Sequence, residues 1–308
     1  LGAFTLAGKY APNCKRHIST QASISNYVTA NAWYDLGASR VILARELSLE
    51  EIRTIREKTP AELEIEAFVH GAMCVSYSGR CLLSNYMTGR DASRGACAQP
   101  CRYHYALMEE KRPGEYFPIE EDEKGSYILN SRDMCMIDHL DDLIDVGLSS
   151  LKIEGRAKSA YYAAIVTGAY RHCLDDAAAG RPIDPVWRDE VEHVSHRPYA
   201  TGFYYGYPGQ YYENSRYIRE WQVVALVTEC DEAGNAVISL RNKFRTGDTV
   251  ELVGPDLRPF AVTIPEMWDE AGEIVAEPRN PQMRLKLRLP RQVPSMTLMR
   301  HQVELSAK

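Results

Sequence analysis

The alternation of apolar and polar positions separates the chain into two differently patterned parts. Before residue 217, apolar runs predict strands at residues 16–21, 40–44, 63–69 and 148–154. Helical periodicity with caps and glycine stops predicts helices at residues 27–36, 48–58, 133–146 and 159–179, and Ser48 with Glu51 fits a capping box. Strands that take turns with helices are typical of a parallel sheet covered by helices.

Such alternation fits either a (β/α)8 barrel or a doubly wound sheet. The chain offers about four strand–helix units, and no GxGxxG motif follows a strand, which disfavours a dinucleotide-binding sheet. We therefore predict that residues 1–217 form the C-terminal part of a (β/α)8 TIM-type barrel, with residues 71–126 as a cysteine-rich loop. The N-terminal half of that barrel is expected to be absent from this chain, which begins with Leu1 instead of methionine.

Beyond residue 217 the rhythm shortens. Candidate strands lie at residues 221–228, 236–240, 249–253, 260–264, 273–276 and 285–289, and turn signals such as Gly254-Pro255 separate them. This pattern predicts a small all-β barrel domain at residues 218–308.

Composition narrows the class of protein. The chain is 45% apolar and 25% charged with a net charge of −6, as in an ordinary globular protein, and the total charge does not by itself favour nucleic acid. It has no run of about 18 apolar residues and no signal peptide, so we expect no membrane span and a cytoplasmic protein. In a reducing compartment, clustered cysteines indicate metal ligands or catalysts.

Five of the eight cysteines fall between residues 74 and 135. Cys74, Cys81, Cys97 and Cys101 have the spacing C-x6-C-x15-C-x3-C, and Cys135 follows later. Four thiolates in one loop can hold an iron–sulfur cluster or a structural zinc ion. Zinc ribbons usually contain C-x2-C knuckles, which this loop lacks, so the spacing favours a cluster, with zinc and buried free thiols as alternatives.

Polar residues gather where the predicted strands end, and the carboxyl ends of parallel strands meet at one edge of a barrel. They are His17, Gln21, Arg45, Glu66, His70, Lys152, Glu154 and Arg156. Lys152, Glu154 and Arg156 alternate and so share one face of a strand, where burial without a partner or ligand is costly. Arginine and lysine suit a dicarboxylate or an RNA phosphate, while a salt bridge inside the barrel is the alternative interpretation.

A basic stretch in the second part has no acidic residue and contains Arg279, Arg284, Lys286, Arg288, Arg291 and Arg300. Lys286 and Arg288 would project from one face of a strand. Such a stretch is more often a charged face turned to solvent, and RNA binding by the β domain is the alternative interpretation.

Several longer motifs resemble a known family. They are EAFVHGAMC (66–74), SGRCLLS (78–84), GRD (89–91), RGACAQPCR (94–102), NSRD (130–133), LKIEGR (151–156) and HRPYATGF (196–203). Together they resemble the signature of peptidase family U32, the collagenase-like peptidases, over about residues 17–203, and the β domain fits that family's C-terminal extension.

The resemblance implies two activities. The family label comes from a collagen-degrading member, but other members install hydroxyl groups: on a tRNA wobble uridine with prephenate, on a ribosomal RNA cytidine, or in ubiquinone synthesis. Several carry a [4Fe-4S] cluster on cysteines of this loop. By motif match the ligands are Cys74, Cys81, Cys97 and Cys101, with Cys135 in reserve. Arg80 and Arg90 join His17, Gln21 and Arg45 as candidate substrate-binding residues, and Glu66, His70, Lys152, Glu154 and Arg156 are the candidate catalytic residues.

The residues favour the hydroxylase over the peptidase. The chain has neither GxSxG nor HExxH, and Glu66 and His70 lie on a predicted strand, so they do not form a helical zinc pair. We predict an iron–sulfur enzyme that makes 5-hydroxyuridine in tRNA with prephenate as co-substrate. A collagenase-like endopeptidase is the first alternative, and a non-catalytic RNA-binding module is the second.

Overall fold

The computed structural model describes residues 1–74, 77, 79–103, 106–107, 110–111, 113–114, 117–118, 131–209 and 217–303. The chain divides into two compact units. Unit 1 comprises Leu1–Ala157 and His196–Tyr217, and unit 2 comprises Lys158–Ser195 and Ile218–Lys308. The predicted domain boundary after residue 217 stays a prediction. Residues 75–76, 78, 104–105, 108–109, 112, 115–116 and 119–126 of the predicted cysteine-rich loop lie outside the described residues.

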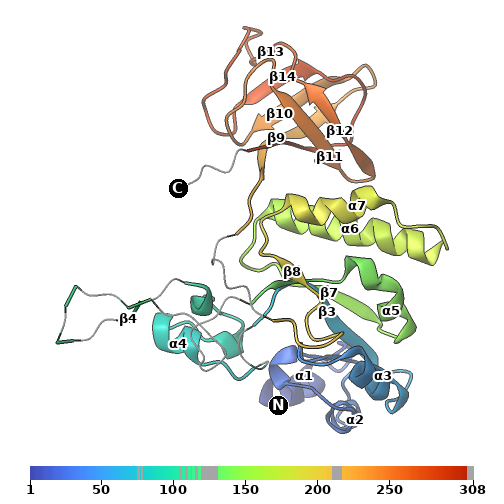
Figure 1. Ribbon diagram of the computed structural model, residues 1–308. Coiled ribbons are helices and arrows are strands. Elements are labelled where there is room, and N and C mark those ends of the chain that lie inside the picture. The colour runs from blue at the N-terminus through green and yellow to red at the C-terminus, as the bar shows by residue number, and fades with distance from the viewer. Residues whose placement is uncertain are drawn as a thin grey trace. The chain divides into compact units, whose positions relative to one another are not determined.

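Unit 1 is built on a mixed sheet, whose strands Figure 1 shows beside helices α2, α3 and α5. Strands β1 (His17–Ile18), β2 (Arg40–Ile42) and β3 (Glu64–Ala72) pair in parallel order, and β7 (Ser150–Ile153) runs parallel to β3. The last residues of β3 pair antiparallel with β6 (Asp133–Cys135), which is parallel to β8 (Tyr199–Ala200). The predicted α/β class with a parallel sheet is therefore confirmed.

Two helices of unit 1, at residues 27–35 and 49–57, agree with the predicted ones, whereas the helices at residues 2–10 and 83–88 were not predicted. The helices of unit 1 are α1 (Gly2–Tyr10), α2 (Tyr27–Asp35), α3 (Leu49–Glu57), α4 (Leu83–Thr88) and α5 (Leu140–Asp145), with short 3-10 helices at Thr20–Ala22, Ala92–Arg94, Pro100–Arg102 and Ile137–His139. The capping box at Ser48 is confirmed, since its side chain accepts from the Glu51 backbone and the Glu51 carboxylate accepts from the Ser48 backbone. A small hairpin pairs β4 (Ala106–Leu107) with β5 (Phe117–Pro118).

One predicted helix of unit 1 was wrong in its N-terminal half. Residues 133–146 were expected to be helical, but Asp133–Cys135 is strand β6, and α5 begins only at Leu140. Pairing with the end of β3 satisfies the backbone of this segment. The buried Asp133 carboxylate also accepts from the backbone N–H of Arg197, 3.2 Å away, which ties the segment to the chain beside β8.

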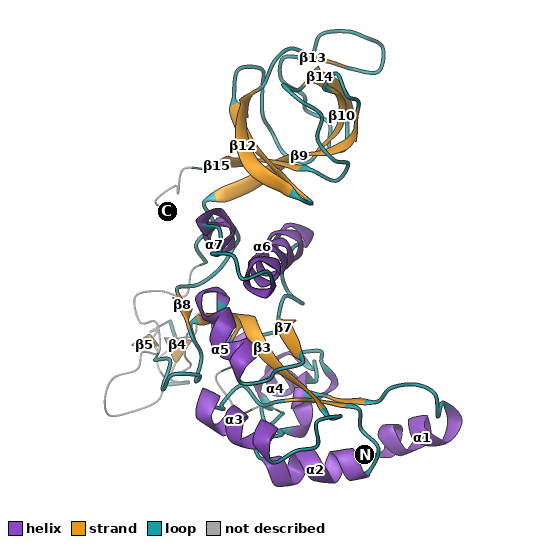
Figure 2. Ribbon diagram, turned by 90° about the vertical axis from the view of Figure 1, so that its right-hand side faces the viewer, coloured by secondary structure: helices purple, strands orange, loops and turns teal. Residues whose placement is uncertain are grey.

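Unit 2 combines helices with an antiparallel sheet. The helices are α6 (Ala160–Ala178), α7 (Pro185–Glu190) and a 3-10 turn at Val191–His193. Figure 2 shows the strands, which are β9 (Trp221–Cys230), β10 (Asn235–Leu240), β11 (Thr249–Gly254), β12 (Leu257–Thr263), β13 (Met267–Trp268), β14 (Arg284–Arg288) and β15 (Leu298–Gln302). Their order in the sheet is β12-β11-β15-β9-β10-β14-β13, and alternate residues such as Ile238, Leu252 and Leu285 form the core.

The short-strand rhythm predicted this sheet with three errors. Residues 273–276 form no strand but a single bridge between Ile274 and Trp268, and neither β13 nor β15 was predicted. Among the described residues, no helix is both long and apolar enough to cross a membrane.

Candidate functional site

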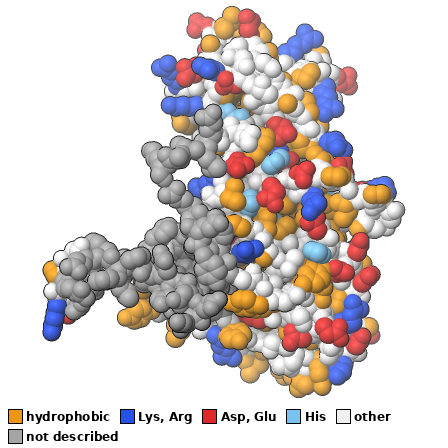
Figure 3. All heavy atoms as spheres, viewed as in Figure 1, with side chains coloured by type: hydrophobic (Ala, Val, Ile, Leu, Met, Phe, Trp, Pro, Cys, Tyr) orange, Lys and Arg blue, Asp and Glu red, His pale blue; other side chains and the backbone are white. Residues whose placement is uncertain are grey.

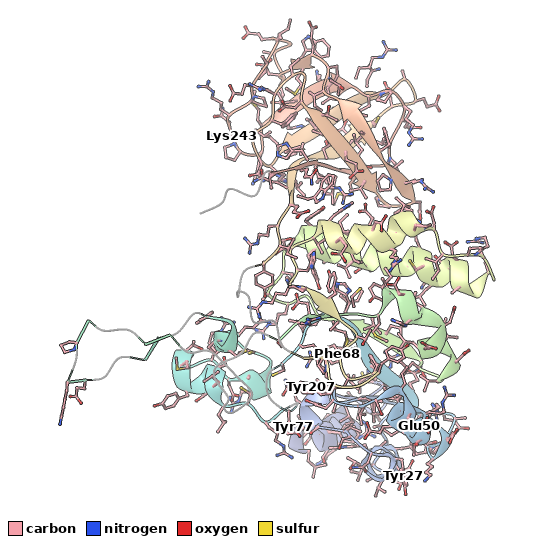
Figure 4. The ribbon with its side chains drawn as sticks, in the orientation of Figure 1. Tyr27, Glu50, Phe68, Tyr77, Tyr207 and Lys243 are labelled. Atoms are coloured by element: carbon pink, nitrogen blue, oxygen red, sulfur yellow. The ribbon has the colours of Figure 1, made fainter. Side chains whose placement is uncertain are left out.

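Four cysteines of unit 1 line one cavity of about 200 Å³. Cys74 follows the end of β3 and Cys81 precedes α4, while Cys97 lies before the 3-10 helix Pro100–Arg102 and Cys101 lies within it. Cys74 is exposed, the other three are partly buried, and all four are free thiols. Tyr77, which also lines the cavity, is labelled in Figure 4. The structure thus brings the four predicted ligands to the same cavity.

Two glycines allow the cysteine-bearing segments to approach the sheet. Gly71 has a φ of +106°, and a Cβ there would lie 2.1 Å from the carbonyl oxygen of Glu154. Gly79 has a φ of +75°, and its Cβ would lie 2.2 Å from the carbonyl oxygen of Gln21. Any side chain at either position would collide with backbone, so these two close approaches require glycine.

The same cavity is also lined by the charged residues Arg45, Glu154 and Arg156 and by the uncharged amide of Gln21. Arg45 Nη2 lies 3.6 Å from a Glu154 carboxylate oxygen, and the backbone N–H of Arg156 donates to the other oxygen at 3.0 Å. The Arg45 guanidinium also lies over the Phe68 ring, 3.6 Å from its centre. Two arginines therefore place positive charge beside thiols that bind metals as thiolates.

Glu66 forms the centre of a second polar cluster on β3. Its carboxylate accepts from Arg40 at 2.8 Å and Ser150 at 2.9 Å and lies 3.3 Å from Lys152 Nζ. Burial would raise the pKa of Glu66, but the hydrogen bond from Ser150 and the cations Lys152 and Arg40 outweigh it, so the pKa lies below its usual value. Glu66 is thus held as a carboxylate, which makes it a weak proton acceptor at neutral pH.

The two clusters meet at Phe68, labelled in Figure 4, because Lys152 Nζ also lies over its ring, 5.4 Å from the centre. His70, two residues further along β3, is buried, and its Nε2 lies 3.3 Å from the hydroxyl of Tyr199. Tyr199 stacks in turn on His196, with 4.3 Å between ring centres. Neither Glu66, His70 nor Lys152 is among the described residues that line the cysteine cavity.

Four other predicted residues lie apart from the described lining of the cavity. His17, Arg80 and Arg90 are exposed. Cys135 lies on β6, in register with His70 of β3. The structure therefore groups Gln21, Arg45, Glu154 and Arg156 with the cysteines but not these four.

The sequence interpretation also missed residues of both clusters. Thr20, Tyr77 and Gln99 line the cavity, and Arg40 and Ser150 hold Glu66. The position of Gln99 between Cys97 and Cys101 was a usable signal, and its left-handed φ of +57° shows how tightly this turn bends. The sequence carried no signal for Ser150, because it meets Glu66 only through the pairing of β3 with β7.

In unit 2, Arg300 corrects the predicted basic stretch. It is fully buried, and its guanidinium donates to Glu190 at 2.6 and 2.8 Å and to Glu251 at 2.6 and 2.9 Å. Arg300 is therefore unavailable to RNA. Glu190, His193 and Glu251 place possible metal-ligand atoms within 4.8 Å of one another, but the guanidinium already supplies the cation there.

Comparison with known proteins covers both units. The family model described as Peptidase family U32 matches residues 1–214, and the model of that family's C-terminal domain matches residues 219–300. The tRNA hydroxylation protein P1 of Bacillus subtilis is 38% identical over 301 residues, covering 95% of this chain and 70% of that protein. The tRNA hydroxylation protein P of Escherichia coli is 38% identical over 315 residues, covering 88% of this chain and 69% of that protein.

Among solved structures, the C-terminal domain of a Geobacillus thermoleovorans protein assigned to the U32 peptidases is 34% identical. The match covers 26% of this chain and 99% of that domain, with a TM-score of 0.25.

Proposed function

The chain belongs to peptidase family U32, and we propose that it is an iron–sulfur enzyme that hydroxylates a base of RNA. The observation that carries the proposal is the single cavity lined by Cys74, Cys81, Cys97 and Cys101. The RNA substrate is supported by two relatives, 38% identical, that are named tRNA hydroxylation proteins. Within this class we propose a tRNA uridine at the wobble position, converted to 5-hydroxyuridine.

The donor set and the size of the cavity both fit a [4Fe-4S] cluster. The cluster takes four thiolates, and four thiols share this cavity. A volume of about 200 Å³ exceeds the ~30 Å³ that one water molecule occupies in the liquid, so the cavity is larger than a single ion needs. The proposed ligands are Cys74, Cys81, Cys97 and Cys101, with Cys135 in reserve and zinc as the alternative metal. When bound, the cluster would supply electrons or an open iron position for substrate.

The charged wall suits the co-substrate that the family resemblance suggests. Prephenate carries two carboxylates, and the planar guanidinium of arginine pairs with carboxylates through two parallel hydrogen bonds. Arg45 is oriented by Glu154 and by the Phe68 ring, so its position costs little additional ordering on binding. Arg156 is exposed at the same cavity and can contact a second anionic group.

The residues of the second cluster have separate proposed roles. Glu66 is ionised and holds Lys152, so we assign it to positioning that ammonium instead of to acid–base catalysis. His70 can hold or transfer a proton at Nε2, where it meets the Tyr199 hydroxyl. Both side chains come from β3, whose end leads into the cysteine-bearing segment.

The parallel strands of unit 1 with their intervening helices support the finer fold assignment. We propose that unit 1 contains the C-terminal part of a (β/α)8 barrel, in which the cavity lies at the carboxyl ends of the strands, where barrel enzymes carry their chemistry.

Two measurements test the proposed function. Anaerobically purified protein should be brown with about four irons per chain, and Cys→Ser at any of the four positions should lower the iron content. Mass spectrometry of tRNA nucleosides should show 5-hydroxyuridine in cells that carry the gene and its loss on deletion. Colourless protein with stoichiometric zinc would overturn the cluster, and unchanged nucleosides would overturn the activity. A gelatin digest run beside them tests the peptidase alternative.

A further inference from the structure

The exposed face of the sheet at β10, β14 and β13 carries cations of one strand and an aromatic ring. These three strands lie side by side in Figures 1 and 2 and are hydrogen-bonded neighbours. On β14, Leu285 and Leu287 point into the core, whereas Arg284, Lys286 and Arg288 are exposed. Trp268 of β13 is in register with Lys286 and therefore shares its face.

Only part of this positive charge is neutralised. Arg284 is paired with Glu229 at 3.0 Å and lies 3.7 Å from Glu270. Within residues 217–303, which the structure describes, neither Lys286 nor Arg288 has a carboxylate within salt-bridge distance. The nearby carboxylate of Asp231 is held by the backbone and side chain of Asn235, at 2.8 and 2.7 Å. Two cations thus project from adjacent outward positions of one strand.

Figure 3 shows basic and acidic side chains interspersed over the face that it displays, in keeping with a net charge of −6. Contact with a polyanion therefore requires cations that no carboxylate neutralises. The neighbour of Lys286 on β10 is the uncharged Val237, and Glu229, in register with Val237 on β9, is paired with Arg284.

We propose that this face, with Lys286, Arg288 and Trp268 at its centre, binds a single-stranded segment of the RNA substrate. The inference rests on the proposed function and assigns it a docking surface away from the cysteine cavity. Outward positions two residues apart on a strand are separated by ~6.6 Å, so the two cations can contact successive phosphates. A base of the same strand then stacks on Trp268, since aromatic side chains bind the face of any base.

The expected effect follows from counterion release. Each phosphate contact to a single strand changes the slope of log affinity against log salt by about 0.7, which at 0.1 M salt is a factor of about five. Removing both cations should therefore weaken binding about 25-fold and make the slope less steep by about 1.4. Stacking is insensitive to salt, so Trp268→Leu should weaken binding by about tenfold and leave the slope unchanged.

In the experiment, the full chain is titrated with a fluorescently labelled 12-nucleotide oligouridine. The titration is repeated at salt concentrations from about 0.05 to about 0.3 M, a range over which the slope of log affinity against log salt can be measured. The test variant is Lys286→Ala with Arg288→Ala. The matched control is Lys243→Ala with Arg53→Ala, which removes the same two charges from exposed positions outside this face. Circular dichroism and thermal unfolding establish that each variant is folded, and an RNA duplex of equal length tests the preference for single strands.

The result expected is the loss of affinity and slope in the test variant alone. The proposal is overturned if the test variant binds as tightly as the wild type, or if the test and control variants lose the same affinity. It is also overturned if binding of the duplex depends on Lys286 as strongly as binding of the single strand. Its failure is distinct from that of the proposed function. If the test variant binds normally and cells still contain hydroxylated tRNA, only the docking surface is wrong; if wild-type cells lack the hydroxylated nucleoside, the enzymatic proposal is wrong.

Discussion

Replacing Arg300 with alanine should destabilise unit 2 far more than any surface arginine would. The Arg300 side chain is fully buried, and the Glu190 side chain is 2% exposed. The guanidinium donates twice to Glu190, twice to Glu251 and once to the hydroxyl of Tyr161 at 3.0 Å, and its Nη2 lies 3.1 Å from His193 Nδ1. Its removal leaves the carboxylate of Glu190 buried without its cation.

The magnitude follows from that uncompensated charge. Removing one partner of a buried ion pair costs about 3–5 kcal/mol, because the remaining charge keeps its desolvation penalty. Arg284 provides the control, since its pair with Glu229 is 53% and 66% exposed, and exposed pairs contribute about 0–1 kcal/mol. Arg300→Ala should therefore lower the free energy of unfolding at least about three times as much as Arg284→Ala. This ratio divides the lower limit for the buried pair, about 3 kcal/mol, by the upper limit for the exposed pair, about 1 kcal/mol.

Urea unfolding followed by circular dichroism measures both losses. A second variant isolates the cause: adding Glu190→Gln to Arg300→Ala removes the orphaned charge and should recover part of the lost stability. Comparable losses for the two arginines would refute the reasoning. So would a double variant as unstable as Arg300→Ala, because the loss would then come from packing and not from charge.

Three further predictions concern single groups. Burial raises the pKa of Tyr161 to about 12. The stability that depends on its protonated hydroxyl should therefore be complete below pH ~10 and lost as the pH rises through about 12. Tyr161→Phe should remove this part of an alkaline unfolding curve. Gly79→Ala should lower thermal stability and iron content, whereas Gly89→Ala, with nothing within 4 Å of its Cβ, should retain the iron; equal iron in both would contradict the tight approach to Gln21. The lowered pKa of Glu66 contributes stability above pH ~4.5 that should be lost as the pH falls further, and an acid unfolding curve unchanged by Glu66→Gln would contradict it.

Elements fixed by local signals could be predicted from the sequence. The capping box at Ser48 and the apolar run of β2 determine their own structures, because the side chains that specify them are neighbours in the chain. Strand β6 could not be predicted in this way. Its residues follow a helix-like pattern, and only pairing with β3, more than 60 residues earlier, makes Asp133–Cys135 extended. Strand β15 is similar, because the buried Arg300 interrupts its apolar alternation. The charge of Arg300 is neutralised by carboxylates on other elements, which the sequence of β15 does not reveal.

The candidate site shows the same division. The cysteine spacing was enough to predict that four thiols share one environment, and the structure places them around one cavity. The partners that set the charge of Glu66 were not predictable, because Arg40 and Ser150 reach it across β2 and β7. Sequence motifs identify residue types, whereas the charge of a side chain such as Glu66 depends on which partners the sheet register brings to it.

The pairing at the base of the cysteine-bearing segment has a consequence for how this protein can change. Ala72 at the end of β3 and Asp133 at the start of β6 are register partners in an antiparallel pair. The chain therefore leaves the sheet and returns to it at the same point, as a hairpin does. Because the entropy of closing a loop grows only with the logarithm of its length, a change in the length of the segment between them costs the sheet little closure entropy. The segment between them can therefore be exchanged as a unit, and a transplant between family members would carry the four cysteines while leaving Glu66 and Lys152 in place.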